Sequence, residues 1–181
     1  MSKYVKILLQ AIALLSITLG VFSAQAMAKT NIQYEVINDD TLVLSGNGEA
    51  EEAIKYGKEV KKSQIKKLII KEGITKITPL GIGTFESVRE VVLPDSLTEI
   101  GDATFAGYYK LKKVRFGKGL QTIAYLAFAS CISLEEIDIP DSVVEIGAAA
   151  FDGCNKLKEI LLPERLKEWN YYILRGCPAL E

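Results

Sequence analysis

The sequence predicts a β-rich, right-handed repeat solenoid of about five 23-residue units behind a short N-terminal cap. Seven apolar columns recur every 23 residues from Ile65 onward and stay in register with no insertion. Each unit also contains a stretch in which apolar and polar residues alternate, as in a half-buried strand. Apolar residues make up 49% of the chain and charged residues 25%, which is typical of a folded protein rather than a disordered one.

Residues 1–28 are expected to be a secretory signal peptide. Two lysines precede an apolar run over residues 7–21, and both Ala24-Gln25-Ala26 and Ala26-Met27-Ala28 fit the small-x-small rule for cleavage. An uncleaved anchor helix is the alternative, although the apolar run is shorter than the roughly 20 residues of a membrane span. The prediction is therefore export, with the mature protein secreted or held at the cell surface.

The net charge of the chain limits the classes of partner that it is expected to bind. Cleavage after residue 28 removes Lys3 and Lys6 and no acidic residue, which changes the formal charge from −1 to −3. Nucleic acid is a poor candidate partner because phosphate binding needs a basic stripe. An anionic membrane surface is equally poor, so the signal peptide is the only expected membrane contact. We therefore expect an extracellular protein or glycan as the partner.

Residues 29–64 are expected to cap the N-terminal end of the solenoid, which would otherwise expose its core and backbone. Two apolar stretches, 32–37 and 42–44, flank the turn residues 38–40 and predict a hairpin. Its inward pairs should come from Tyr34, Val36, Leu42 and Leu44. Residues 49–62 are rich in Glu, Lys and Ala and predict a short helix.

The unit at residues 134–156 illustrates the local pattern. Ile137 and Ile139 should point inward while Glu136 and Asp138 point outward, because successive side chains of a strand alternate between its faces. Residues 140–142 form a turn, 143–146 a second short extended piece and 147–153 a compact helical turn closed by glycine. The fixed period with this Leu/Ile spacing is typical of a leucine-rich-type solenoid, whose units bury their apolar residues only by stacking. The five units are expected at residues 65–87, 88–110, 111–133, 134–156 and 157–181.

The pattern resembles a known family. Residues 137–154 (IDIPDSVVEIGAAAFDGC) resemble the BspA-like, or Treponema pallidum-type, leucine-rich repeat, and residues 91–108 repeat this string with Tyr in place of Cys. The resemblance covers residues 65–181, and the block before them resembles the hairpin that precedes the repeats in this family. Departures lie in the terminal units, at Ile82, Phe85, Trp169 and Leu174. The resemblance implies a secreted or surface-exposed binding protein, often an adhesin of host-associated bacteria, with no particular ligand.

The C-terminal unit has two interpretations. It carries Trp169, Tyr171, Tyr172 and Ile173, and the sequence stops on the first column of a sixth unit. Either these bulky side chains cap the solenoid themselves, or they form an exposed apolar end that pairs with another chain. A longer repeat protein that ends early is also compatible with this pattern.

Residues that could carry out chemistry are scarce. The chain has no histidine, and Cys131, Cys154 and Cys177 share one column. Three thiolates without a fourth ligand do not make a tetrahedral metal site, so no metal or cofactor is expected. The cysteines are either buried thiols, as the family resemblance implies, or a disulfide between neighbouring units. No serine has an adjacent base and no acidic pair is isolated in an apolar pocket, so we predict that the protein is not an enzyme.

The outward strand face is the remaining candidate for function. One of its columns is charged and alternates in sign over most of its length, which is typical of a solvated ladder: Lys67, Glu90, Lys113, Glu136 and Glu159. The other mixes apolar and charged residues and is the predicted ligand-binding column: Ile69, Val92, Arg115, Asp138 and Leu161. Apolar residues around a charged pair are typical of a protein-binding patch, with Arg115 as the anchor. Two other functions remain as alternatives to adhesin-like ligand binding: an assembly module that associates through its repeat ends, and a secreted enzyme inhibitor.

Overall fold

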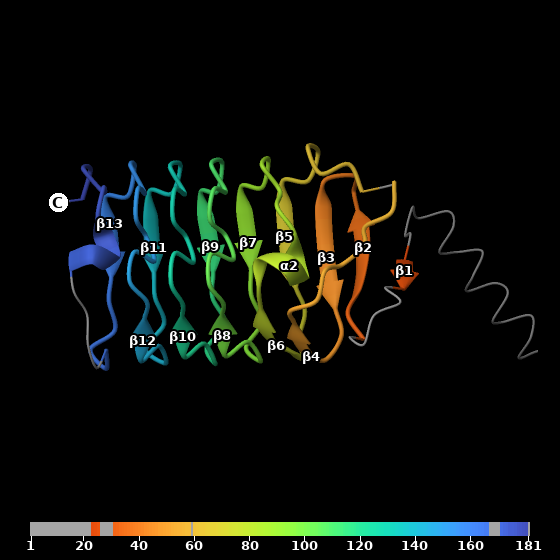
Figure 1. The fold of residues 1–181 in the computed structure, drawn as a ribbon, viewed down its shortest axis with the longest axis horizontal. Coiled ribbons are helices and arrows are strands. Elements are labelled where there is room, and N and C mark those ends of the chain that lie inside the picture. Colours follow the sequence, from red (N-terminus) through yellow and green to blue (C-terminus); the bar gives the residue numbers. More distant parts are fainter. Residues whose placement is uncertain (1–22, 26–30, 59, 167–170, 181) are drawn as a thin grey trace, which may run out of the picture.

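The computed structural model describes residues 23–25, 31–58, 60–166 and 171–180 and forms an elongated stack of rungs (Figure 1). Successive units lie side by side along the long axis, from the N-terminal hairpin to the C-terminal unit. Positions 23 residues apart become neighbours; for example, Lys67 pairs with Glu90, and Glu90 with Lys113. The predicted β-rich repeat solenoid is confirmed.

One side of the solenoid is a sheet of six strands. Its order is β1 (Ser23–Gln25), β2 (Gln33–Ile37), β3 (Thr41–Ser45), β5 (Lys67–Ile70), β7 (Glu90–Val92) and β9 (Lys113–Arg115). The strands β1, β2 and β3 pair antiparallel, while β3, β5, β7 and β9 pair parallel. The same face continues in a separate two-stranded sheet of β11 (Glu136–Asp138) and β13 (Glu159–Leu161).

A second, parallel sheet runs along the adjacent side. It contains β4 (Gly48–Ala50), β6 (Ile74–Ile77), β8 (Glu99–Ile100), β10 (Thr122–Ile123) and β12 (Glu145–Ile146). Turns form the third side, with the short helix α2 (Pro79–Ile82) in the first unit and the 3-10 helix η1 (Tyr171–Leu174) in the last. The compact helical turn predicted over residues 147–153 is instead a run of hydrogen-bonded turns, because Ala149 has a φ of 55° and interrupts any helix.

The core is a set of stacked side-chain columns. Phe105, Phe128 and Phe151 are each 0% exposed. Their rings stack at centroid distances of 5.1 and 5.4 Å with interplanar angles of 19° and 3°. Ile137 and Ile139 are buried, whereas Glu136 and Asp138 are exposed, as the alternation predicts. Each apolar column therefore forms a continuous contact between neighbouring units.

The cap differs in part from its prediction. The hairpin is confirmed, since Tyr34 pairs with Leu44 and Val36 with Leu42. The helix predicted over residues 49–62 does not form, because residues 48–50 pair with β6 and so extend the second sheet by one rung. The stretch after them forms tertiary bonds: the Gly57 amide donates to the Tyr34 hydroxyl at 2.6 Å. These contacts compete with the amide-to-carbonyl bonds that a helix would need.

The two termini are described in part. Ser23–Gln25, within the predicted signal peptide, form β1 against β2. The other residues of 1–28, and Trp169, lie outside the described residues. No helix in the described part of the chain is long and apolar enough to cross a membrane. In the last unit, Ile173 is buried, Leu174 and Leu180 are half-buried against the core, and Tyr172 is exposed.

Candidate functional site

The strand ladder of the outer face is interrupted between β9 and β11. At the other boundaries, one amide of each unit donates to a carbonyl of the unit before it. These bonds run from Arg89 to Lys66 at 2.7 Å, from Lys112 to Arg89 at 2.9 Å, and from Lys158 to Glu135 at 2.9 Å. The equivalent bond from the Glu135 amide to the Lys112 carbonyl is absent from the described chain, and β9 and β11 belong to different sheets. Two parallel strand edges therefore face each other unpaired.

The same boundary is closed on the other two sides of the solenoid. In the second sheet, the Gly147 amide donates to the Ile123 carbonyl at 2.8 Å. On the turn side, the Phe128 amide donates to the Ala150 carbonyl at 2.7 Å, and the Phe128 and Phe151 rings stack. The third and fourth units therefore separate only on the strand face.

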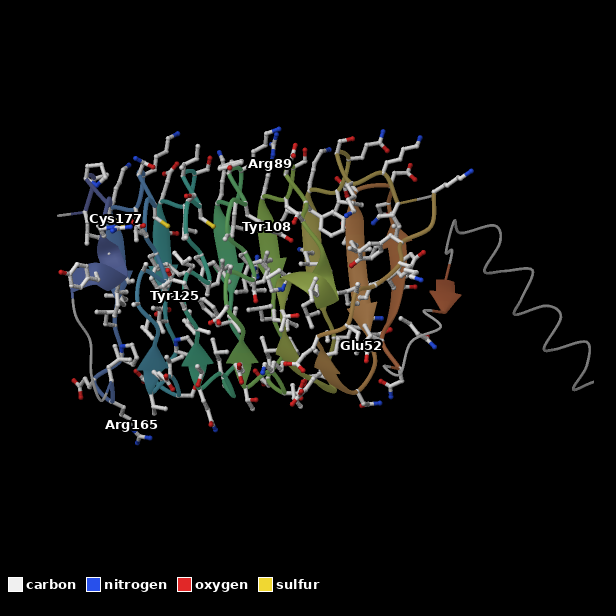
Figure 2. All side chains as sticks on the ribbon, in the orientation of Figure 1. Glu52, Arg89, Tyr108, Tyr125, Arg165 and Cys177 are labelled. Carbon is white, nitrogen blue, oxygen red and sulfur yellow. The ribbon has the colours of Figure 1, made fainter. Side chains whose placement is uncertain are left out.

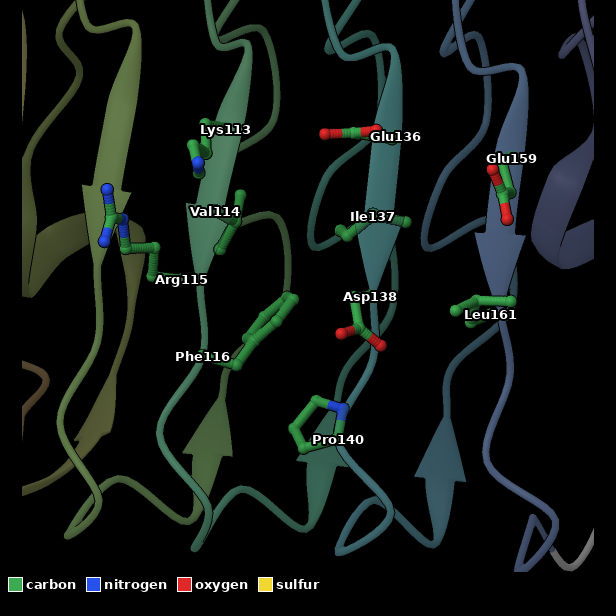
Figure 3. Close-up of a pocket in the computed structure, with 10 residues that line it drawn as sticks. All are labelled: Lys113, Val114, Arg115, Phe116, Glu136, Ile137, Asp138, Pro140, Glu159 and Leu161. Atoms are coloured by element: carbon green, nitrogen blue, oxygen red, sulfur yellow. The ribbon is translucent and has the colours of Figure 1, made fainter.

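We attribute this gap to Phe116. The equivalent positions hold Ile70, Leu93 and Ile139, which are buried, and Leu162 of the last unit, which is half-buried. Phe116 is the half-buried member in the middle of the stack. Figure 3 shows its ring on the side of β9 that faces β11. The ring meets Phe128 edge to face at a centroid distance of 6.1 Å. A ring is larger than an aliphatic side chain, and a packed core accommodates the extra volume by moving the backbone.

The gap forms a groove of about 480 Å³ (Figure 3), which lies within the roughly 300–1,000 Å³ typical of ligand sites. Its lining residues are Lys113, Val114, Arg115, Phe116, Glu136, Ile137, Asp138, Pro140, Glu159 and Leu161. Three of the five predicted binding residues meet here: Arg115, Asp138 and Leu161. The other two, Ile69 and Val92, are half-buried and lie outside this lining.

The sequence interpretation missed Phe116 and Pro140 and treated Lys113, Glu136 and Glu159 as part of a solvated ladder. One signal could have found the groove. Phe116 is the aromatic residue of an otherwise aliphatic column, and Gly117-Lys118-Gly119 follows it where another unit has Pro140-Asp141-Ser142. Both departures lie directly at the boundary that opens.

The charges on the two sides of the groove are arranged differently. On the N-terminal side, Glu90 pairs with Lys67 at 3.2 Å and with the Arg115 Nε at 3.0 Å. Figure 3 shows Arg115 reaching back from the groove over β7. On the C-terminal side, Glu136 lies directly opposite Glu159 in the β11–β13 ladder. No ion pair in the described chain involves Glu136, Asp138, Glu159 or Lys113. The lining therefore carries three negative charges against the two positive charges of Lys113 and Arg115.

The cysteine column lies away from the groove, and its thiols are free. Each Sγ donates to a phenylalanine carbonyl of the preceding unit: Cys131 to Phe105 at 3.3 Å, Cys154 to Phe128 at 3.3 Å and Cys177 to Phe151 at 3.2 Å. Tyr108, which replaces cysteine in the same column, donates to Gly83 in the same way, and Figure 2 shows it and Cys177 along the stack. The column therefore satisfies turn carbonyls inside the core.

The three thiols should differ in reactivity. Burial raises the pKa of Cys131 to about 12, and the neighbouring Cys177 thiol together with burial raises the pKa of Cys154. The neighbouring Cys154 thiol lowers the pKa of the half-buried Cys177. At pH 8 we expect a disulfide reagent to modify Cys177 first and the other two only on unfolding, because the thiolate is the reactive form. Thiol titration of native protein should show one fast group that Cys177→Ser removes; a fast phase that survives this substitution would contradict the assignment.

Other candidate chemistry finds no support in the described residues. No group of three or more His, Cys, Asp or Glu side chains there is placed to hold a metal ion. Gly81-Ile82-Gly83 forms the end of α2 and its C-cap, and the Thr78 side chain caps the start of that helix. Gly117-Lys118-Gly119 forms a turn within the third unit, between β9 and β10. The groove is therefore the candidate site.

Comparison with known proteins agrees with this architecture. The sequence model of the BspA type leucine rich repeat region matches residues 83–181, in six copies. A leucine rich cell surface protein from Faecalibacterium prausnitzii A2-165 is 25% identical, with a TM-score of 0.65 over 87% of this chain and 38% of that protein. The T. pallidum leucine rich repeat protein is 27% identical, with a TM-score of 0.63 over 87% of this chain and 69% of that one.

A leucine-rich repeat protein from Bacteroides ovatus ATCC 8483 is 23% identical, with a TM-score of 0.60 over 87% of this chain and 46% of that one, which shows the shared fold. The chain spans 38% of the length of the F. prausnitzii protein. No curated protein matches the sequence.

Proposed function

We propose that this chain, which belongs to the BspA-type leucine-rich repeat family, is a binding protein. Its proposed ligand occupies the groove between β9 and β11. A repeat fold of this type is a binding or scaffold fold, because its stacked strands form an extended rigid surface. The ligand is an extracellular protein or glycan, and the role is adhesin-like recognition without turnover.

The observation that carries this proposal is the interruption of the strand ladder. From β3 to β9 the face is a continuous parallel ladder. At β9 and β11 it opens into a groove with charged rims, and Leu161 is 55% exposed there. Concave sites with a few polar groups and exposed apolar contacts are the usual places for ligand binding.

The proposed location is the cell surface or the extracellular space. Two independent features support it: the signal-peptide pattern of residues 1–28, and the similarity to a protein described as a cell surface protein of F. prausnitzii. Fractionation of the producing cells, with an antibody against the repeats, tests this directly. Protein found only in the cytoplasm would overturn the location.

Replacing Arg115 and Leu161 together by alanine should weaken ligand binding while leaving the fold intact. Their side chains are 60% and 55% exposed, and an exposed ion pair such as Arg115–Glu90 contributes about 1 kcal/mol or less. The unfolding free energy should therefore change by no more than about 1 kcal/mol. The measurement is a surface binding screen against extracellular-matrix proteins, plasma proteins and a glycan panel, with parent and variant side by side.

A matched control replaces Arg165 and Tyr109, an exposed cation and an exposed apolar residue outside the groove. Alanine at these two positions should leave binding unchanged. A saturable ligand that binds the Arg115/Leu161 variant as tightly as the parent would exclude the groove as the site.

A further inference from the structure

We propose that the groove between β9 and β11 binds an extended, basic segment of a protein partner. This proposal rests on the proposed function and names the class of ligand that the groove would bind. Three features of the groove point to such a segment: unpaired strand edges, an excess of carboxylates over cations, and an apolar floor beside the exposed Leu161. Each feature selects one property of the ligand.

The unpaired strand edges select an extended backbone. The bond between the Glu135 amide and the Lys112 carbonyl is missing, although its equivalents form at the neighbouring boundaries. Strand edges of this kind present unused amide and carbonyl groups to a partner. An extended peptide can bond to one of these edges through its own main chain, which is a common form of peptide recognition. A glycan offers no matching backbone repeat.

The carboxylates select positive charge. Glu136 and Glu159 face each other directly in the β11–β13 ladder, and like charges in that position repel. Asp138 lies two residues after Glu136 on β11 and also lines the groove. Arg115 is drawn back toward Glu90, with its Nε 3.0 Å from the Glu90 carboxylate, and Lys113 is the remaining cation of the lining, so the three carboxylates are compensated only in part. Lysine or arginine side chains of a ligand would relieve this repulsion, whereas a neutral ligand would desolvate the carboxylates without pairing them.

The floor and the far rim of the groove select side chains with apolar stems. Phe116 and Pro140 are half-buried at its base, and Leu161 is exposed beside Asp138 (Figure 3). Lysine and arginine cover apolar surface with their methylene chains while the charged end reaches a carboxylate. Successive side chains of an extended segment point to opposite sides, so alternating basic and aliphatic residues fit both surfaces.

The test measures fluorescence anisotropy with three labelled heptapeptides of one design. The first alternates lysine with valine, the second glutamate with valine and the third serine with valine. The lysine peptide should bind saturably and the other two should not. Its affinity should fall as sodium chloride rises from about 50 to 200 mM, because exposed charges are screened over this range.

Variants of the protein separate groove binding from general attraction to an acidic chain. The double variant Glu136→Gln/Asp138→Asn should weaken binding about three- to tenfold, as expected for two exposed charges. The matched control Glu145→Gln/Glu164→Gln changes the net charge equally at exposed positions outside the groove and should shift the affinity less than about twofold. Phe116→Leu keeps every charge but lets β9 and β11 pair, and it should eliminate saturable binding.

Amide exchange gives a second readout. The Glu135 and Glu136 amides should exchange faster than those of Lys112 and Lys113 in the free protein, and lysine-peptide binding should slow them. Equal weakening by the groove variant and its control, or equal affinity for the lysine and glutamate peptides, would overturn the proposal. A screened ligand that the Arg115/Leu161 variant loses, with no lysine-peptide binding, would overturn the basic segment and leave the proposed function standing. If neither binds, both are overturned.

Discussion

Replacing Phe128 by alanine is expected to lower the unfolding free energy by about 3–5 kcal/mol, the usual cost of removing a fully buried phenylalanine. Phe128 is 0% exposed and its ring stacks against both Phe105 and Phe151. It also meets Phe116 edge to face. The substitution therefore leaves a cavity at two unit boundaries at once. Denaturant unfolding followed by circular dichroism measures the effect.

The position of Phe128 makes the loss more damaging. The boundary between the third and fourth units already lacks the bonds between β9 and β11, so the ring stack, the β10–β12 pairing and the backbone bonds of the turn side hold it together. Stability in a solenoid is a sum of unit terms and nearest-neighbour interfaces. In the variant, amides of residues 134–166 should lose protection from exchange before those of residues 65–110.

Tyr125→Ala provides the control. This side chain, labelled in Figure 2, lies three positions before Phe128 in the same unit and is 52% exposed. Its removal should change the unfolding free energy by no more than about 0.5 kcal/mol. If the Phe128 and Tyr125 variants unfold at the same denaturant concentration, the aromatic stack does not hold the third and fourth units together.

The sequence predicts the stack because periodicity reports which side chains point inward. Columns at 23-residue intervals place Phe105, Phe128 and Phe151 in contact, and the structure has them stacked. The interruption of the ladder is a different kind of property. Phe116 is apolar in an apolar column, so the pattern is satisfied whether or not β9 reaches β11. The shape of one side chain, not its polarity, decides whether the strand hydrogen bonds form there.

The cap differs from its prediction because amino-acid composition alone does not determine whether a segment is helical. Residues 49–62 contain good helix formers, yet helix propensity is a weak signal that tertiary contacts override. Residues 48–50 continue a sheet and the Tyr56 hydroxyl donates to the Ile82 carbonyl at 2.8 Å, which ties the stretch to the first unit.

The predicted binding column is an intermediate case. Its outward direction follows from the alternation of apolar and polar residues, but the grouping of Arg115, Asp138 and Leu161 depends on where the ladder opens.

Replacing Gly117 by alanine is the second substitution expected to have a large effect, with a loss of about 3 kcal/mol or more. Gly117 is buried in the turn after β9, and a Cβ built on it would overlap the Pro94 carbonyl and press on the Asp95 amide. Both are backbone groups of the preceding unit and cannot rotate away. Because this turn packs so closely on the second unit, it holds the end of β9 toward β7 and helps to keep the groove open.

The same turn contains its own control. Lys118 is exposed, and it contacts the second unit through its backbone amide, which donates to the Asp95 Oδ1 at 2.8 Å. Lys118→Ala retains that bond and should be nearly neutral, within about 0.5 kcal/mol. Thermal unfolding of the two variants under identical conditions compares steric overlap with simple loss of a side chain. A Gly117→Ala protein as stable as Lys118→Ala would show that the turn moves freely, and the packing of β9 against the second unit would then not account for the open groove.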